Sequence, residues 1–257
     1  MSALLSAAIA TLVFCAPGYP GVAGDAQPFL DQFVSSAVVS AGWPAGSLAG
    51  IYDPTEAGGL AKLGGPDAVL AFVPYPFFVE HAAQLHLTPL AQADVAGIGT
   101  QQRWSLVVKK GRVTGPASLA DLTILSVAGY APDFVRRVAL QGWEFPAEVK
   151  IEPTAQILSA LRRAAAGEPI AALLDQTQAA ALPSLPFASE LEVVRESAQL
   201  PVAVVAVIDS RLSASRARAL QQGLLKMGHV AGGADSLRAL QLNGFVPPQL
   251  PTYTAAP

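Results

Sequence analysis

Short apolar runs alternate with amphipathic segments along this chain, and this alternation limits the folds that are open to it. Thr11–Ala16 and Ala68–Val73 are apolar runs, each followed directly by a proline. Between them, Phe29, Phe33 and Ala37 recur at four-residue spacing, which is typical of one face of a helix. Buried strands that alternate with helices form parallel pairs joined by helical crossovers. We therefore expect an α/β fold.

Two long apolar runs bracket a second α/β block in the middle of the chain. Arg103–Val108 and Val202–Ile208 each read as a long strand, and the segment between them has strands and helices of its own. Two such strands would enter and leave an inserted lobe and form a two-strand hinge. With 257 residues, the chain is long enough for two lobes with separate cores. We predict lobe one over residues 1–103 plus 209–257, and lobe two over 104–208.

The stretch Ile124–Leu140 reads as a strand end, a tight turn at Ser126–Tyr130 and a helix that begins near Pro132. Open α/β sheets bind ligands where strands run into such turns. Free N–H groups and the helix dipole make this place suited to anions. Here, however, the turn presents the apolar side chains of Val127 and Ala128.

Aromatic and polar residues follow several other strand ends. Tyr19 and Tyr75 sit in proline-flanked turns, and Tyr130 lies in the turn of the second lobe, so the three rings could line one cleft. Local packing of each ring is the alternative. Asp175 could cap a helix or hold a ligand hydroxyl. The predicted ligand-binding residues are Tyr19, Pro20, Gly21, Tyr75, Pro76, Phe77, Ser126, Val127, Ala128, Gly129, Tyr130, Asp175, Gln176 and Thr177.

Composition and motifs exclude several functions. Charged residues make up 14% of the chain and the net charge is −3 without a basic run, so we expect no nucleic-acid partner. His81 and His86 are five apart and share no helix face, and Cys15 is the single cysteine. No nucleotide-binding glycine motif occurs. We therefore predict no metal site, no cofactor and no catalytic residue. An enzyme would need converging titratable groups, and Asp175 is the one cleft carboxylate we can nominate.

From Thr11 to Phe245, the chain resembles the substrate-binding proteins of ABC-type importers with the type 2 periplasmic binding protein fold. It is most similar to their phosphate/phosphonate-binding branch. The resemblance rests on the order and spacing of Pro17, Pro74-Tyr75, Ser118–Leu122, Ser126–Tyr130 and Gly244-Phe245. It implies two mainly parallel sheets joined by a two-strand hinge, a periplasmic location with the leader removed, a monomer, and a membrane transporter as partner.

The ligand-binding turn departs from that family. The family's turn is similar to Ser-Thr-Ser-Gly, whereas this chain has Ser126, Val127, Ala128 and Gly129. Burying an oxyanion without matching donors costs several kcal/mol. We therefore predict that the cleft binds a hydrophobic small molecule, lipid or sterol-like. The alternatives are a phosphonate or other oxyanion, an enzyme on the same fold, and a lobe pair that serves only for docking or sensing.

Overall fold

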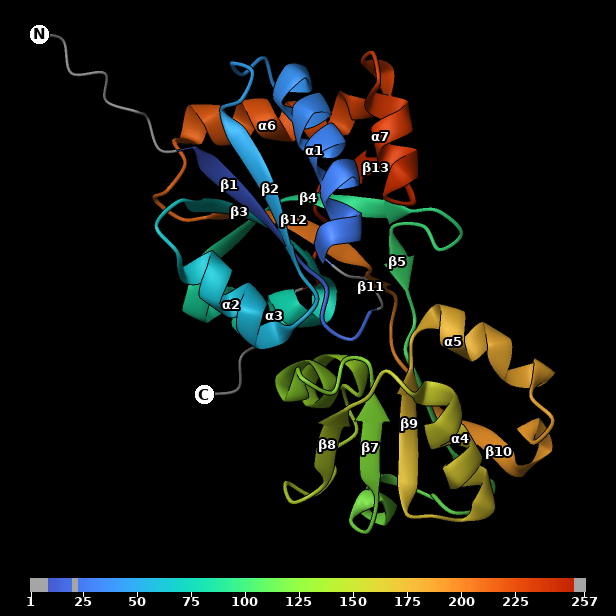
Figure 1. Cartoon of the computed structure of the whole chain (residues 1–257). Coiled ribbons are helices and arrows are strands. Elements are labelled where there is room, and N and C mark those ends of the chain that lie inside the picture. Colours follow the sequence, from blue (N-terminus) through green and yellow to red (C-terminus); the bar gives the residue numbers. More distant parts are fainter. Residues whose placement is uncertain (1–8, 20–22, 252–257) are drawn as a thin grey trace, which may run out of the picture.

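The chain folds into two lobes of unequal size (Figure 1). The structure is a computed structural model and describes residues 9–19 and 23–251, so the predicted site residues Pro20 and Gly21 lie outside the described residues. One lobe is built on a six-stranded sheet and the other on a five-stranded sheet, with a two-stranded ladder between them. The predicted two-lobed α/β fold with a two-strand hinge is therefore confirmed.

The larger lobe contains both ends of the described chain. Its sheet has the order β13-β4-β12-β3-β1-β2. The strands are β1 (Ala10–Cys15), β2 (Leu48–Asp53), β3 (Ala68–Pro74), β4 (Leu87–Val95), β12 (Ala203–Ile208) and β13 (Leu242–Val246). The helices α1 (Ala23–Ser40), α6 (Ala214–Lys226) and α7 (Gly233–Ala239) cover one face, together with η5 (Met227–His229). The helices α2 (Glu56–Gly64) and α3 (Tyr75–Leu85) cover the other (Figure 1).

The smaller lobe is inserted between β5 and β11. Its sheet has the order β10-β6-β9-β7-β8. The strands are β6 (Ser105–Lys109), β7 (Thr123–Ser126), β8 (Lys150–Pro153), β9 (Ile170–Leu174) and β10 (Leu191–Glu196). The helical segments are η1 (Pro116–Leu119), the π-helix η2 (Phe134–Ala139), α4 (Ile157–Ala166), α5 (Gln176–Ala181), η3 (Leu182–Ser184) and η4 (Ala188–Glu190).

Both sheets are mixed rather than mainly parallel. β1 pairs in parallel with β2 and β3, and β7 pairs in parallel with β8 and β9. The strands next to the hinge run the other way: β12 is antiparallel to β3 and β4, and β6 is antiparallel to β9 and β10. The reversal follows from the chain path, because the strands that leave one lobe and return to it run in opposite directions.

The hinge consists of β5 (Gln101–Gln102) and β11 (Leu200–Pro201), which pair in antiparallel fashion. The long apolar strands lie beyond this ladder. The run Ala203–Ile208 forms the buried strand β12 of the larger sheet. The predicted end of the second lobe at residue 208 is therefore wrong, because a strand with both faces covered belongs to the larger core and not to the hinge.

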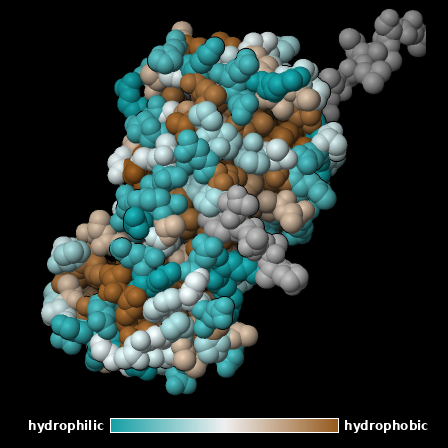
Figure 2. Space-filling model, turned by 180° about the vertical axis from the view of Figure 1, so that it is seen from behind, coloured by the Kyte–Doolittle hydropathy of each residue, from teal (hydrophilic) through white to brown (hydrophobic). Residues whose placement is uncertain are grey.

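An aromatic cluster forms the core of the larger lobe on the α1 face. Phe14 lies 5.5 Å from Phe33 and 5.3 Å from Phe72, between ring centroids. Phe245 joins at 6.0 Å from Phe33. On the surface, Figure 2 shows hydrophilic and hydrophobic residues interspersed over one face of both lobes, with one hydrophobic cluster on the smaller lobe.

Candidate functional site

The strand ends of the two lobes face each other across the gap. β1 and β3 are parallel, so the turns that follow them lie at one edge of the larger sheet. The turn after β7 lies at the facing edge of the smaller sheet. The two edges touch: a Cβ added at Gly18 would lie 2.6 Å from the carbonyl oxygen of Val127. The predicted placement of these turns at facing sheet edges therefore agrees with the structure.

A cavity of about 470 Å³ lies between the lobes, beside the hinge. The larger lobe and the hinge contribute mainly small, apolar and amide side chains, and the smaller lobe contributes the first turn of α5. The lining residues are Ala16, Tyr19, Pro74, Val95, Ile98, Gln102, Asp175, Thr177, Gln178, Val202, Ala203, Leu240, Gln241 and Leu242. Among these described residues, Asp175 is the only one with a charged side chain.

Asp175 and Tyr19 both line this cavity, and the carboxylate acts electrostatically on the tyrosine. Burial raises the pKa of the Tyr19 hydroxyl, and the carboxylate of Asp175 raises it further. Burial also raises the pKa of Asp175, although the N–H groups of Gln178 and Thr177 oppose that shift. The carboxylate accepts from the Gln178 N–H at 2.8 Å, and the Gln178 side chain accepts from the Asp175 N–H at 3.2 Å. Asp175 thus caps α5 in a capping box and still lines the cavity.

The other two predicted tyrosines lie in the contact between the lobes rather than in the cavity lining. Tyr75 is 2% exposed and its ring lies 6.3 Å from that of Phe134. The ring of Tyr130 lies 6.5 Å from that of Phe77, which is fully buried. Pro76 is buried beside them. These aromatic residues therefore hold the lobes together, while Tyr19 alone of the three tyrosines lines the cavity.

The polar groups in the turn after β7 already have hydrogen-bond partners within the smaller lobe. The buried hydroxyl of Ser126 donates to the Leu173 carbonyl at 2.8 Å and accepts from the Ala128 N–H at 3.1 Å. Val127 and Ala128 are buried. A Cβ at Gly129 would lie 2.1 Å from the Glu152 carbonyl oxygen, so only glycine fits there. Both partners of the Ser126 hydroxyl lie inside the smaller lobe. The cavity between the lobes is lined by none of the four turn residues Ser126, Val127, Ala128 and Gly129.

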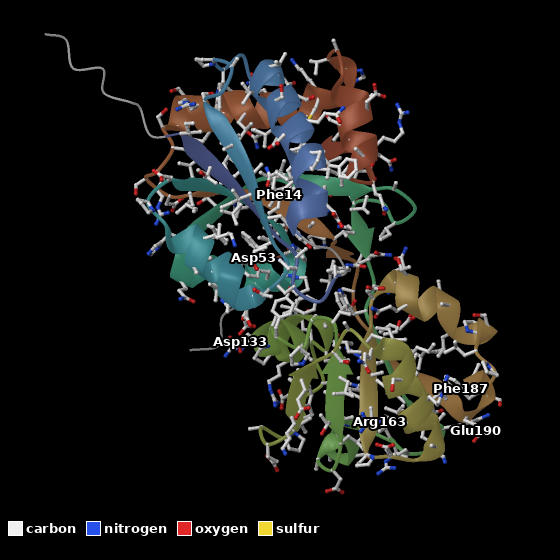
Figure 3. All side chains as sticks on the ribbon, in the orientation of Figure 1. Phe14, Asp53, Asp133, Arg163, Phe187 and Glu190 are labelled. Atoms are coloured by element: carbon white, nitrogen blue, oxygen red, sulfur yellow. The ribbon has the colours of Figure 1, made fainter. Side chains whose placement is uncertain are left out.

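A carboxylate of the larger lobe occupies the N-terminus of the helix that follows this turn. Glu80 on α3 accepts from the N–H groups of Asp133, at 2.9 Å, and Phe134, at 3.4 Å. Figure 3 shows Asp133 at the edge of the smaller lobe that faces α3. Burial raises the pKa of Glu80, although these two N–H groups favour its charged form. The position that suits an anion is thus filled by the chain's own carboxylate.

Sequence reasoning missed several of the cavity residues. Of the two predicted residues that follow Asp175, Thr177 lines the cavity and Gln176 does not, whereas Gln178 lines it and was not predicted. Gln102 comes from the hinge strand β5, and Gln241 follows α7. The placement of Gln102 and Gln241 depends on how the chain ends of the larger lobe meet the hinge, for which the sequence carries no local signal.

Several titratable groups of the larger lobe are paired with each other. Glu56 lies 2.8 Å from His81, and Asp53 pairs with Lys62. Cys15 is fully buried, as expected for a small apolar side chain, and burial raises the pKa of its thiol to about 12. Such a thiol is not a nucleophile near neutral pH. Within the described part of the chain, no three His, Cys, Asp or Glu side chains gather as a metal site would require.

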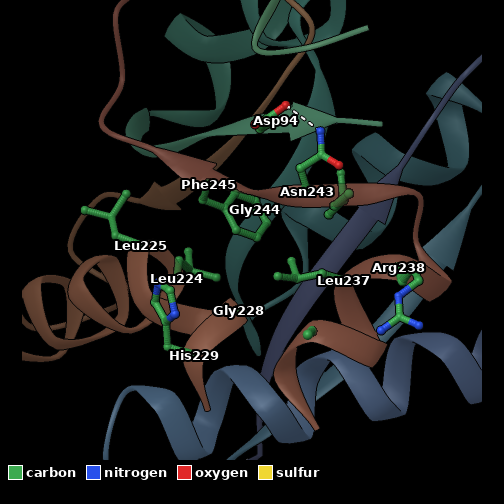
Figure 4. A pocket seen from close by; sticks show the side chains of 12 residues that line it. Asp94, Leu224, Leu225, Gly228, His229, Leu237, Arg238, Asn243, Gly244 and Phe245 are labelled. Atoms are coloured by element: carbon green, nitrogen blue, oxygen red, sulfur yellow. Dashed lines mark hydrogen bonds between the residues drawn. The ribbon is translucent and has the colours of Figure 1, made fainter. Parts of the chain in front are cut away.

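A larger cavity of about 620 Å³ lies away from the cleft, among α6, α7 and β13 (Figure 4). Several of its polar side chains already have partners: Asn243 donates to Asp94 at 3.1 Å, and Arg238 pairs with Asp235 at 2.8 Å. It is formed by the larger lobe alone. The cavity between the lobes is therefore the better candidate, because ligands of such sheets bind at the strand ends.

Comparison with known proteins identifies the class of fold. The chain is similar to XAC2383 from Xanthomonas citri bound to ATP, with a TM-score of 0.64, 15% identity, and coverage of 93% of this chain and 92% of that one. It is also similar to a binding protein component of an ABC phosphonate transporter, PA3383 from Pseudomonas aeruginosa, with a TM-score of 0.59, 14% identity, and coverage of 93% and 82%.

A third similar structure is PhnD1 from Prochlorococcus marinus in complex with methylphosphonate. Its TM-score is 0.53 at 14% identity, and the match covers 93% of each chain. No family model matches the chain, and no curated protein matches it either. The chain thus has the fold of the type 2 periplasmic binding proteins. None of its described helices is both long enough and apolar enough to cross a bilayer.

Proposed function

We propose that this protein is an extracytoplasmic solute-binding protein that delivers a small molecule to a membrane importer. The observation that carries the proposal is the cavity of about 470 Å³ between two lobes that are joined by two strands. Its volume falls in the range of small-molecule sites, about 300–1,000 Å³. Hinged lobes that close on a ligand are a common device of periplasmic binding proteins.

The charges around the cavity favour a ligand without a net negative charge. Asp175 is the charged side chain among the described lining residues, and its carboxylate would repel an anion. Glu80 already accepts from the N–H groups at the start of η2. A neutral or basic group that donates a hydrogen bond to Asp175 avoids both conflicts. Tyr19 offers a ring beside this carboxylate, which suits a cation or an apolar body.

A phosphonate or another oxyanion is the second candidate. The solved structures named above favour it, because one comes from a phosphonate transporter and another holds methylphosphonate. A fourth similar structure, with a TM-score of 0.52 and 14% identity, is an ancestral arginine-binding protein bound to arginine. None of the ligands named for these structures is a lipid or a sterol, so our expectation of a lipid or sterol-like ligand has no support from the comparisons.

Titration calorimetry separates the two candidates. The panel contains butylamine, butanol, methylphosphonate and inorganic phosphate, tested on the wild type, on Asp175→Asn and on Asp121→Asn. Asparagine caps a helix about as well as aspartate, so the first variant keeps the α5 cap, and Asp121 is an exposed control in the same lobe. We expect butylamine to bind and to lose at least tenfold in affinity with Asp175→Asn alone. Submicromolar binding of methylphosphonate or phosphate would establish the oxyanion alternative instead.

A further inference from the structure

A third cavity, of about 370 Å³, lies in the larger lobe, between α1 and the ends of β1, β2 and β3. Helix α1 contributes Ala26 and Leu30, and the strands contribute mainly aromatic and apolar residues. The lining residues are Phe14, Cys15, Ala16, Tyr19, Ala26, Leu30, Tyr52, Phe72, Val73, Pro74, Ala203 and Leu240. We call this space the α1 cavity.

The α1 cavity adjoins the cavity between the lobes. Ala16, Tyr19, Pro74, Ala203 and Leu240 line both of them. Tyr19 is 37% exposed and stands at this boundary, where its hydroxyl is close enough to Asp175 for the carboxylate to raise its pKa. The two spaces therefore border on each other at Tyr19.

The chemistry of the two parts differs. In the described lining of the α1 cavity no residue is charged, and its polar side-chain groups are the thiol of Cys15 and the hydroxyls of Tyr19 and Tyr52. The Cys15 thiol is already directed to the Thr55 carbonyl, at 3.4 Å. The aromatic cluster of Phe14 and Phe72 forms one wall. Such a surface gains from burying hydrocarbon and offers few partners to a polar group.

We propose that the α1 cavity receives an apolar chain of the ligand while the ligand's polar, hydrogen-bond-donating end lies at Asp175. This inference rests on the proposed function and narrows the solute to an amphipathic molecule with a neutral or basic head. Such a ligand would pass from one cavity to the other beside Tyr19, which lines both. Burial of the chain would supply most of the affinity, and Asp175 would set the orientation.

Competition binding with a homologous series tests this inference. The fluorescent probe is N-phenyl-1-naphthylamine, and the competitors are linear 1-aminoalkanes from ethylamine to decylamine. A buried methylene contributes about 0.8 kcal/mol, which is about fourfold in affinity. We expect wild-type affinity to rise by about that factor for each added methylene until the α1 cavity is filled.

One matched pair of variants tests where the apolar chain of the ligand binds. Ala26→Leu fills the α1 cavity from α1, where Ala26 is partly exposed. Ala217→Leu makes the same change on α6, at a partly exposed position that lines a different cavity. We expect Ala26→Leu to bind ethylamine and butylamine as the wild type does but to lose tenfold or more for octylamine. The control should behave as the wild type at every length.

Two results would overturn the inference. The first is a wild-type affinity that does not depend on chain length, which needs no variant to be measured. The second is an equal response of Ala26→Leu and Ala217→Leu at every length. In either case, binding of butylamine that depends on Asp175 would leave the proposed function standing. If no amine binds at any length and methylphosphonate binds instead, both the inference and the proposed ligand class are wrong.

Discussion

Removal of the Glu80 side chain should open the lobes. Glu80 belongs to α3 of the larger lobe, and its carboxylate accepts hydrogen bonds from the N–H groups of Asp133 and Phe134 in the smaller lobe. In Glu80→Ala these two donors lose their acceptor whenever the lobes are together, whereas water can satisfy them when the lobes are apart. An unsatisfied donor costs about 1–3 kcal/mol, and partial exposure of this contact reduces that cost. We expect a loss of about 1–2 kcal/mol, or a 5- to 30-fold shift toward the open form.

Glu80→Gln is the informative partner of that variant. The glutamine amide keeps an acceptor oxygen and removes the charge, whose burial raises the pKa of Glu80. We therefore expect Glu80→Gln to stay as closed as the wild type near neutral pH. Glu148→Ala, at an exposed position of the smaller lobe, controls for a change of charge.

Spin labels on the two lobes provide the measurement. Ala61 on α2 and Lys150 on β8 are exposed, and the elements α2 and β8 lie on the side away from the hinge (Figure 1). Cysteines introduced there can be labelled selectively, because burial raises the pKa of the native Cys15 thiol to about 12. Glu80→Ala should lengthen the distance between the labels. Distances that are equal in Glu80→Ala and the wild type, or equally long in Glu80→Gln and Glu80→Ala, would refute the reasoning.

Three further predictions concern pH and packing. Burial raises the pKa of Glu80 and Asp175 in the closed form, so closure takes up protons; it should be most favourable below the ordinary carboxylate pKa of about 4 and weaken as pH rises through the raised values. Label distances between pH 4 and 8 check this, and shorter distances at higher pH would contradict it. Gly59→Ala should lose about 1–3 kcal/mol in urea unfolding, because the new Cβ would lie 2.1 Å from the Cys15 sulfur, whereas Gly64→Ala meets nothing within 4 Å and should change stability by less than about 1 kcal/mol. Ser126→Ala should cost about 1–3 kcal/mol through the Leu173 and Ala128 bonds and leave butylamine affinity within about twofold; a larger loss of affinity would make Ser126 a ligand-binding residue.

The sequence predicted the strands that are continuously apolar. The predicted run Val202–Ile208 begins one residue before β12, and Ala68–Val73 ends one residue before β3 does. β4 (Leu87–Val95) was missed, because Pro89 interrupts it and Gln92 and Asp94 make its end polar. Gln92 is 1% exposed and donates to the Thr100 carbonyl at 2.6 Å. Tertiary partners of this kind overrule local propensity.

The sequence predicts at which sheet edge the candidate site lies, but it does not predict which side chains contact each other there. That turns after parallel strands share an edge follows from the alternation of strands and helices, and Tyr19 and Asp175 do meet across the cavity. No sequence pattern indicates the role of Glu80, because its partner Asp133 is 53 residues away along the chain. Whether Tyr75 and Tyr130 line a cavity or pack between the lobes depends on how closely the lobes approach each other. The positions of the strand ends alone do not specify that distance.

If the proposed ligand class is right, selection against anions would follow from the same contacts that hold the lobes together. An oxyanion at the start of η2 would have to displace the Glu80 carboxylate from the N–H groups of Asp133 and Phe134. It would also separate the aromatic residues that pack between the lobes, such as Tyr130 and Phe77. A neutral or basic solute beside Tyr19 and Asp175 leaves these contacts in place, because that cavity lies at the hinge. Specificity is a difference of affinities, and under the proposed function the chain's own carboxylates, Glu80 and Asp175, would supply the repulsive part of that difference.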